Sequence, residues 1–395
     1  MIASTTRPVT ADRTVLWIVM AATAVLDAGN GVVFGLIAEI QKARGLETYE
    51  LGYVSGALFA ASLVGLLGLA HLADRGHARA MLAGALGLGA VALAWFAVAE
   101  ALWELIAARV LSGLAVSLFV SAGRAVVSRL DPSRAGTNLG RLASAEIGGF
   151  VAGPALGALL FRVGGLALPF WVLSALSVVA LLALLLLAPD LPNSAEPEDL
   201  GRWRRTGIDM LADRDVLAAA LLALAIFLPV GAYDALWSKY LTDLGAGTTF
   251  VGLSLTVYAA PIVVLAGAGG RLADRIGPMR AAKWSMFVII PVIVAYGLID
   301  SYWLVAATAI VEALAQAVAT PASQAAMTRA CPPERIGAGH GLSGAVGLSG
   351  AGLLASGAPA IYDSYGPGWL FAGVAVASGL IAAVAFTIDQ SDFAG

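Results

Sequence analysis

Four ionisable residues lie inside stretches of sequence that are otherwise apolar: Asp27, Arg109, Asp234 and Glu312. A charged side chain within a lipid bilayer costs several kcal/mol unless it is paired or hydrated, so residues of this kind mark functional sites. Because burial disfavours the ionised form of a carboxyl group, the three acids are suited to taking up and releasing protons near neutral pH. We therefore interpret the three acids as candidates for proton coupling and Arg109 as a candidate functional residue beside them.

The four candidates differ in depth. Asp27 and Glu312 fall near the middle of their stretches, which makes them the sharpest candidates. Asp234 lies in the outer third of its stretch, where we expect it to be hydrated and its replacement to matter less. Arg109 is near the outer end of its stretch, so a second interpretation stays open, in which its side chain extends outward to the headgroups.

Amide and aromatic side chains accompany these charges. The candidate residues for lining a substrate cavity are Asn30, Phe34, Tyr233, Trp237, Tyr258 and Gln316. An apolar, aromatic wall with isolated carboxylates suits amphipathic or cationic compounds. An organic anion would instead favour paired basic residues at mid-depth, and Arg109 stands alone there.

The composition explains what must position these residues. The chain of 395 residues is 59% hydrophobic and 12% charged, about half the charge of a soluble protein. Apolar runs of about 20 residues span a bilayer as helices, since each must satisfy its own backbone there. We predict an all-α membrane protein with twelve transmembrane helices. The predicted spans are 14–38, 49–70, 80–99, 103–127, 139–161, 168–188, 216–241, 250–270, 281–299, 302–327, 336–361 and 368–387.

The basic residues predict the orientation. Most of the 23 Lys and Arg fall in segments that are cytoplasmic if the N-terminus is inside. We expect both termini to be cytoplasmic and the protein to lie in a bacterial cytoplasmic (inner) membrane. A polar stretch divides six spans from six, which predicts an N-terminal bundle (1–188), a cytoplasmic linker (189–214) and a C-terminal bundle (215–395).

A short hydrophilic pattern occurs once in each half. The second copy runs from Gly270 to Arg280 and contains Asp274, Arg275 and Gly277. The first copy contains Asp74 and Arg75 but has His71 in place of the glycine. Duplicated patterns of this kind are typical of transporters built from repeated bundles.

Two further patterns lie within spans. Gly149, Gly153, Pro154 and Gly157 form G-x-x-x-G-P-x-x-G, in which glycines on one stripe let a second helix approach closely. Arg109 begins R-x-x-x-G, which ends at Gly113.

Together these patterns resemble the major facilitator superfamily over essentially the whole chain. The resemblance implies two pseudo-symmetric six-helix bundles, with helices one, four, seven and ten around a central cavity. It implies that the aspartate of each hydrophilic hairpin helps to hold an inward gate, and we expect this gate to depend on Asp274. The glycine–proline motif resembles that of the drug:proton antiporter branch, and Arg109 resembles an arginine that takes part in proton coupling.

Our leading hypothesis is a proton-coupled exporter of small amphipathic or drug-like compounds that works by alternating access. Its expected partners are a small-molecule substrate, protons and lipid, with no nucleic acid and a monomer as the working unit. One alternative is an exporter of a sugar, amino acid or lipid-like metabolite. An alternative of another class is a non-transporting membrane sensor. No catalytic motif predicts an enzyme, no cofactor is expected, and the single cysteine, Cys331, excludes a thiolate metal cluster.

Overall fold

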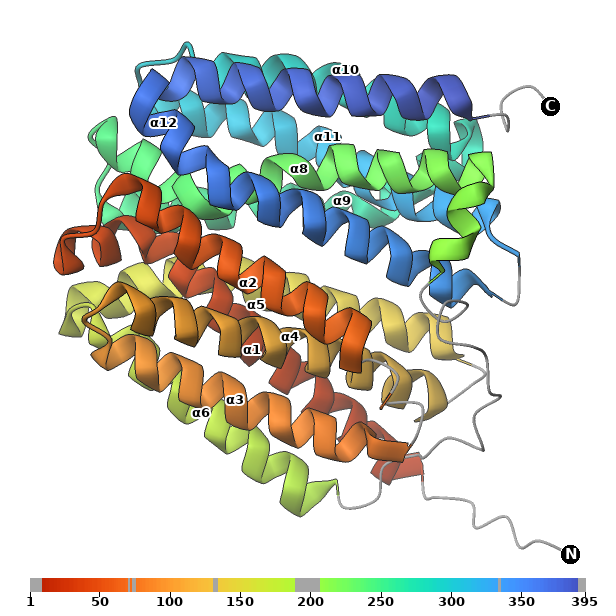
Figure 1. Cartoon of the computed structure of the whole chain (residues 1–395). Coiled ribbons are helices and arrows are strands. Elements are labelled where there is room, and N and C mark those ends of the chain that lie inside the picture. The colour runs from red at the N-terminus through yellow and green to blue at the C-terminus, as the bar shows by residue number, and fades with distance from the viewer. Residues whose placement is uncertain are drawn as a thin grey trace, which may run out of the picture.

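The computed structural model describes residues 9–69, 72, 76–130, 134–188, 207–332 and 335–389. These parts of the chain contain eleven α-helices and one short 3-10 helix, η3, and no strand (Figure 1). All eleven α-helices are long and apolar enough to cross a membrane. The elements are α1 (Val9–Arg44), α2 (Thr48–Leu69), α3 (Ala78–Val98), α4 (Leu102–Leu130), α5 (Ala135–Gly164), α6 (Ala167–Leu187), η3 (Ile208–Ala212), α8 (Arg214–Asp243), α9 (Thr248–Ile276), α10 (Pro278–Tyr296), α11 (Tyr302–Ala330) and α12 (Ile336–Ile388).

The helix count differs from the expected twelve because the last two predicted spans lie in one element. Helix α12 has 53 residues, which at 1.5 Å per residue is about 80 Å, more than twice a hydrocarbon core. It is not straight. Gly366 has non-helical angles (φ 80°, ψ 174°) and is followed by Pro367, and the helix folds back on itself there (Figure 1). Glycine tolerates this positive φ and proline has no amide hydrogen to donate, so helical geometry breaks at this point.

The helices pack in two groups, α1–α6 (the first half) and η3 with α8–α12 (the second half). In the first half α1 packs on α5, α2 on α4, and α3 on both α4 and α6. In the second half α8 packs on α12, α9 on α11, and α10 on both α11 and α12. The contacts between the halves involve mainly α2 with α12 and α5 with α9, with a smaller contact of α1 with α8.

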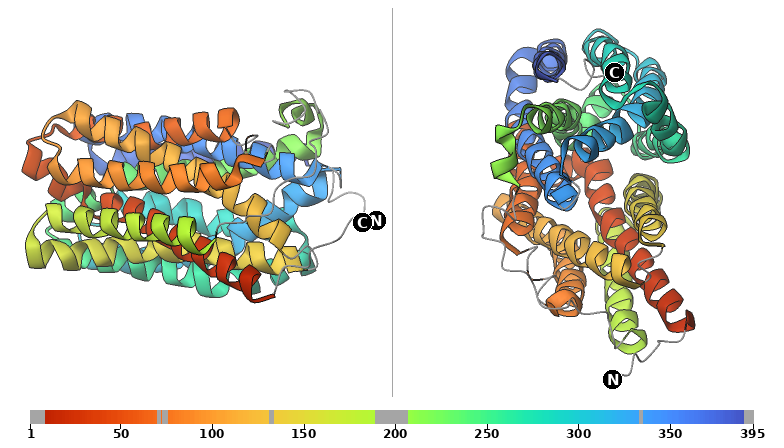
Figure 2. Two further views of the ribbon diagram at one scale, coloured as in Figure 1. Left: turned by 90° about the horizontal axis from the view of Figure 1, so that it is seen from below. Right: turned by 90° about the vertical axis from the view of Figure 1, so that its right-hand side faces the viewer.

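The axes of the helices are roughly aligned, with the chain direction reversing from one helix to the next, so the molecule has two ends (Figures 1 and 2). We call the end at which α1 and α8 finish the outer end, following the predicted orientation. The start of α1 and the finish of α12 both lie at the opposite, inner end, on different sides of the molecule (Figures 1 and 2).

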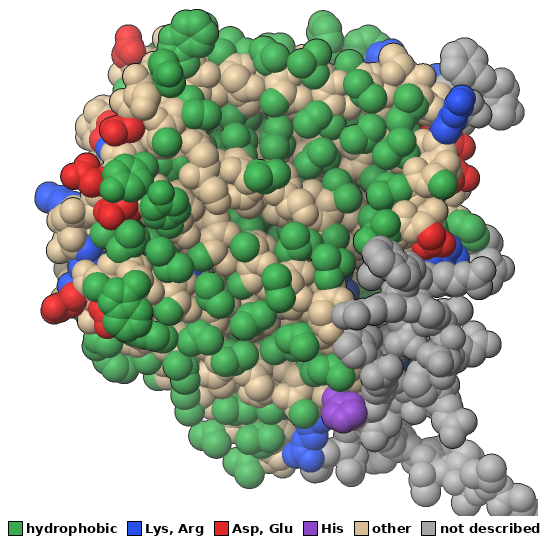
Figure 3. All heavy atoms as spheres, in the orientation of Figure 1, with side chains coloured by type: hydrophobic (Ala, Val, Ile, Leu, Met, Phe, Trp, Pro, Cys, Tyr) green, Lys and Arg blue, Asp and Glu red, His purple; other side chains and the backbone are tan. Residues whose placement is uncertain are grey.

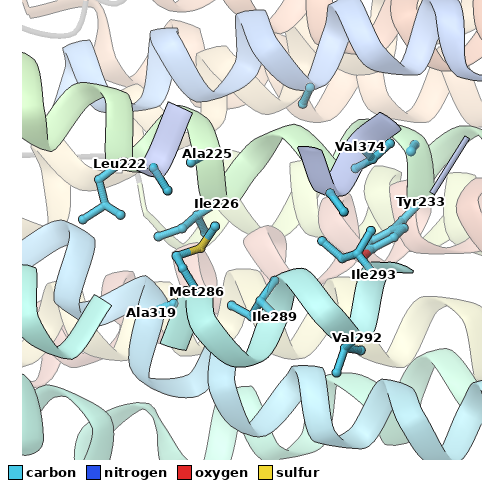
Figure 4. Close-up of a cluster of buried hydrophobic side chains, with 14 of the residues drawn as sticks. Leu222, Ala225, Ile226, Tyr233, Met286, Ile289, Val292, Ile293, Ala319 and Val374 are labelled. Atoms are coloured by element: carbon cyan, nitrogen blue, oxygen red, sulfur yellow. The ribbon is translucent and has the colours of Figure 1, made fainter. Parts of the chain in front are cut away.

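The surface and the interior both fit a membrane. On the face shown in Figure 3, hydrophobic side chains cover the middle of the molecule and charged side chains gather near its two ends. The interior of the second half is filled by aliphatic side chains from α8, α10, α11 and α12 (Figure 4). Tyr233 lies farther along α8 than the aliphatic residues Leu222 and Ile226 (Figure 4).

Candidate functional site

A buried ion pair joins the two halves. Arg109 on α4 donates a hydrogen bond from Nη2 to Asp234 Oδ2 on α8 at 2.9 Å. The Arg109 side chain is 0% exposed and that of Asp234 is 7% exposed. The expectation that Asp234 is hydrated at the outer mouth is therefore wrong. Arg109 does not extend to the headgroups either, because its side chain is fully buried and Asp234 of α8 is its counter-ion.

Only part of the Arg109 guanidinium is used in this pair. Nε and Nη1 are buried and have no hydrogen-bond partner among the described residues. Removing one partner of a buried pair leaves the other as an uncompensated charge, at a cost of about 3–5 kcal/mol. Loss of either partner is therefore costly in this state, and Asp234 determines whether Arg109 is neutralised.

Among the described residues, three further hydrogen bonds join the halves, and all lie towards the outer end. Ser238 Oγ on α8 donates to the Gly35 carbonyl on α1 at 2.9 Å. Thr256 Oγ1 on α9 donates to the Val151 carbonyl on α5 at 2.7 Å. Thr248, at the start of α9, hydrogen-bonds Glu39 near the finish of α1. With the ion pair, these bonds close the outer end between the halves.

Glu312 lies inside the second half, surrounded by phenols. Its side chain is fully buried on α11. Tyr233 Oη on α8 donates to both carboxylate oxygens, at 3.0 and 3.2 Å, and Tyr296 Oη on α10 donates to Oε2 at 2.6 Å. Tyr258 on α9 and Gln316 on α11 also face this carboxyl group. Helices α8 and α10 thus donate the hydrogen bonds that hold the carboxyl group in place, and α9 and α11 supply further polar groups around it.

Trp237 fixes the orientation of two of these phenols. Its ring centroid lies 5.3 Å from that of Tyr233 and 5.0 Å from that of Tyr296, both edge-on. Such pairs add about 0.5–1.5 kcal/mol beyond their buried area. Trp237 is itself buried, and its Nε1 has no partner among the described residues.

Asp27 occupies a different environment. It lies midway along α1 in the first half, is half-buried, and receives no hydrogen bond from a described residue. The charged groups that act on it are Glu146 and Arg124. These two are paired at 3.1 Å between α5 and α4. The structure thus brings Arg109 and Asp234 together. It places Glu312 inside the second half, and it leaves Asp27 in the first half, near the pair of Glu146 and Arg124.

The other predicted cavity residues on α1 are packed rather than open. Asn30 is buried and donates from Nδ2 to the Leu26 carbonyl of its own helix at 3.2 Å. Phe34 is buried and stacks on Phe150 of α5, with ring centroids 5.7 Å apart.

The glycine–proline motif forms the contact between α1 and α5. A Cβ atom added at Gly149 or Gly153 would collide with the backbone of α1 at Ala24 or Ala28, and one at Gly157 would crowd Val32. Pro154 packs against glycines on two other helices, Gly31 and Gly35 of α1 and Gly252 of α9. The expected smooth stripe is therefore present, and its proline also contacts the other half.

The hydrophilic hairpin of the second half joins α9 to α10. Gly277 has φ 93°, which favours glycine, and Pro278 begins α10. Asp274 lies 3.7 Å from Arg329 of α11, and both side chains are largely exposed. Gly270 lies within α9, and Arg275 and Arg280 flank the turn with exposed side chains. In the first-half copy, Asp74 and Arg75 lie outside the described residues.

Two contributors to the site were not predicted from the sequence. Tyr296 ends α10 and has no charged neighbour in sequence that would draw attention to it. Ser238 is one of many small polar residues in the apolar helices. Its role depends on the approach of the Gly35 carbonyl, which single-sequence patterns do not contain.

Comparisons with known proteins agree with this architecture. A family model described as the Major Facilitator Superfamily matches residues 19–237 and 216–392. The multidrug resistance protein MdtG of Serratia proteamaculans is 24% identical over 271 residues, which cover 67% of this chain and 66% of that protein. MdtG of Proteus mirabilis is 22% identical over 258 residues, which cover 64% of each chain. The chain therefore spans about two thirds or less of the length of these relatives.

Two solved transporter structures share the fold. An inward-facing, unoccupied bacterial homolog of the human lysosomal transporter Spinster has a TM-score of 0.81 at 15% identity, covering 98% of both chains. The nucleoside transporter NupG has a TM-score of 0.77 at 14% identity, covering 95% of this chain and 99% of that one. Since the family model covers most of its length, the chain belongs to the Major Facilitator Superfamily, and its long apolar helices are of the kind that cross a membrane.

Proposed function

We propose that this protein is a proton-coupled exporter of small amphipathic or drug-like compounds. The observation that carries the proposal is the pair of buried acids on adjacent helices, Asp234 and Glu312, one neutralised by Arg109 of the other half and one held by phenols. Buried acids are expensive to ionise, so they exchange protons when their surroundings change. The multidrug resistance proteins among its relatives and the α5 motif favour export over uptake.

Alternating access follows from the repeated packing of the two halves. The contacts α1–α5, α2–α4 and α3–α6 correspond to α8–α12, α9–α11 and α10–α12. We therefore assign residues 1–188 and 215–395 to two bundles and 189–214 to the linker between them. If each arm of α12 crosses the membrane once, the chain crosses it twelve times and both termini are cytoplasmic. The bonds at the outer end correspond to an inward-facing state.

The substrate class follows from the chemistry of the wall. Tyr233, Trp237 and Tyr258 place aromatic rings beside the buried carboxyl groups, and such rings would suit a lipophilic cation when the site opens. Such a compound and a proton would compete for Glu312, and competition for one acid produces exchange. Asp27 provides a second acid for this exchange in the first half. The working unit is a monomer in the bacterial cytoplasmic membrane.

Transport in proteoliposomes tests the proposal. Purified protein is reconstituted, a pH gradient is imposed, and movement of the lipophilic cation ethidium is followed by fluorescence. The expected result is uphill ethidium movement that collapses with the gradient, is abolished by Glu312→Gln and is strongly reduced by Asp27→Asn. As a control for loss of a carboxylate, Asp243→Asn alters an exposed pair with Lys239 and should transport normally. Normal uphill movement in both Glu312→Gln and Asp27→Asn would show that the proton path lies elsewhere.

A further inference from the structure

One turn of α8 contacts two functional groups at once. Asp234 and Ser238 bond the first half, through Arg109 and the Gly35 carbonyl. Tyr233, the neighbour of Asp234, points to the other side of α8 and donates to both oxygens of Glu312. Adjacent residues on a helix point about 100° apart. Helix α8 therefore contacts the first half with one face and the buried acid Glu312 with another.

A proline lies in α8 one turn before Tyr233, on the side of the inner end. Pro229 is inside α8 and is buried. Proline removes one backbone hydrogen bond and lets a helix bend at that point. The segment of α8 that follows Pro229 can therefore tilt relative to the segment that precedes it, carrying Tyr233, Asp234 and Ser238 together.

The surroundings of Glu312 respond to such a tilt. The groups that face its carboxylate are Tyr233 from α8, Tyr258 from α9, Tyr296 from α10 and Gln316 from α11 itself. Hydrogen bonds donated to a carboxylate favour its ionised form. Of the two phenols that donate hydrogen bonds to Glu312, Tyr233 lies on the helix that is bonded to the first half at the same turn, and Tyr296 lies on α10.

We propose that Tyr233 is a positioning residue that couples closure of the outer end to release of the proton from Glu312. The inference rests on the proposed function, because it assigns the coupling step of the same site. When Asp234 leaves Arg109, the segment above Pro229 tilts and Tyr233 withdraws from Glu312. The carboxylate, with one donor fewer, takes a proton from the outer solution. When the outer end closes, Tyr233 returns and the proton leaves towards the inner end, while the phenol keeps its own proton throughout.

A double-mutant cycle tests this coupling without relying on transport. Spin labels are placed on cysteines at two exposed outer positions, Lys42 on α1 and Ser364 on α12, in a Cys331→Ser background. The distance distribution gives the ratio of outer-open to outer-closed molecules in lipid nanodiscs. Glu312→Gln, which mimics the protonated acid, should raise this ratio about tenfold, the change that corresponds to one hydrogen bond to a charged group.

The decisive comparison repeats Glu312→Gln in two phenol variants. In Tyr233→Phe the same change should alter the ratio by less than about twofold, since the connection is cut. Tyr296→Phe is the matched control: it also removes one phenol donor from Glu312, but α10 carries none of the bonds to the first half described above. Here Glu312→Gln should keep its full effect. An equal effect of Glu312→Gln in the wild type and in Tyr233→Phe would overturn the proposal, and so would its loss in Tyr296→Phe.

A second variant tests the hinge while both phenols stay in place, so its result does not depend on the folding of Tyr233→Phe. Pro229→Ala restores the missing backbone donor, stiffens α8 and leaves both phenols in place, so it should also weaken the response to Glu312→Gln. An undiminished response in Pro229→Ala would exclude the hinge. Failure of this cycle with intact pH-driven transport would reject the role of Tyr233 and leave the proposed function standing, whereas absence of transport in the wild type would reject the function itself.

Discussion

The same pair of helices, α2 and α12, meets very differently at the two ends of the molecule. At the outer end, a Cβ atom added at Gly52 would collide with the backbone of α12 at Ser356, and one at Gly56 with the Ser356 side chain. Towards the inner end, a Cβ atom at Gly344 of α12 would meet Leu66 of α2 at 3.8 Å, an ordinary contact. The halves therefore touch backbone to backbone at one end and through side chains at the other.

The polar contacts differ between the two ends in the same way as the packing does. The outer end has a buried ion pair at 2.9 Å between the halves, whereas the inner-end pair of Asp274 and Arg329 is 3.7 Å apart, exposed and contained within the second half. Removing one partner of a buried ion pair is costly because the other charge stays buried, whereas an exposed ion pair contributes little to stability. The free energy that favours this state is thus concentrated at the outer end, and changes there should have the largest effects.

Removing the Asp234 charge should have the largest effect. Asp234→Asn leaves Arg109 buried without a counter-ion, which should destabilise the outer-closed state by about 3–5 kcal/mol. Labels at Lys42 and Ser364 should report a mainly outer-open population. The paired change Arg109→Met with Asp234→Leu should recover most of the loss, because no charge then remains unpaired. A closed population in Asp234→Asn equal to that of the wild type would contradict the importance of the pair.

Adding volume at the tight contact should have the next largest effect. Gly52→Val must displace the α12 backbone, and overpacking of this kind costs about 1–3 kcal/mol. Gly344→Val adds the same atoms on the same helix pair and should change the outer-closed population little. The measurement is the label distance together with the melting temperature in detergent. Similar shifts in the two variants would show that the tighter packing of α2 on α12 at the outer end does not control the outer-closed population.

The sequence predicted the helices well because their signals are local. Long apolar runs can only be helices in lipid, and their ends carry charges or glycine, as at Gly277. The exception is α12, where Gly366 and Pro367 bend the backbone while the helical pattern continues on both sides, so two predicted spans became one element.

The candidate site was predicted only in its ionisable members. Arg109, Asp234 and Glu312 stand out because charge is rare in these helices, but their partners depend on how helices from different parts of the chain meet. Asp234 was expected in water because depth was judged along its own helix, whereas its burial depends on the helices that pack around α8 and on the approach of Arg109. The hydrogen bond from Tyr296 to Glu312 is shorter than those from Tyr233, yet nothing in the local sequence distinguishes Tyr296 from other interfacial tyrosines.

A single neutral hydrogen bond between the halves should have a smaller effect. Ser238→Ala removes the bond to the Gly35 carbonyl and should weaken the outer-closed state by about 1 kcal/mol. Ser285→Ala is its matched control, since Ser285 is also buried but donates to Ala281 of its own helix. The label distances should shift in the first variant and stay unchanged in the second. A shift of equal size in Ser285→Ala would mean that the effect reflects general loss of packing.

The inner-end pair should have the smallest effect on this state and a different effect on transport. Asp274→Asn breaks an exposed contact with Arg329, so the outer-closed population and the melting temperature should change by no more than about 1 kcal/mol. If closure of the inner end depends on this hairpin, as expected from the sequence, the Asp274 carboxylate would there bind arginines or helix ends. Asp274→Asn should therefore slow transport per bound substrate while substrate affinity stays near that of the wild type. Equilibrium binding of ethidium and its initial flux rate, measured on the same preparation, separate the two quantities. A collapse of affinity with a normal rate per bound substrate would show that Asp274 acts in binding and not in the gate.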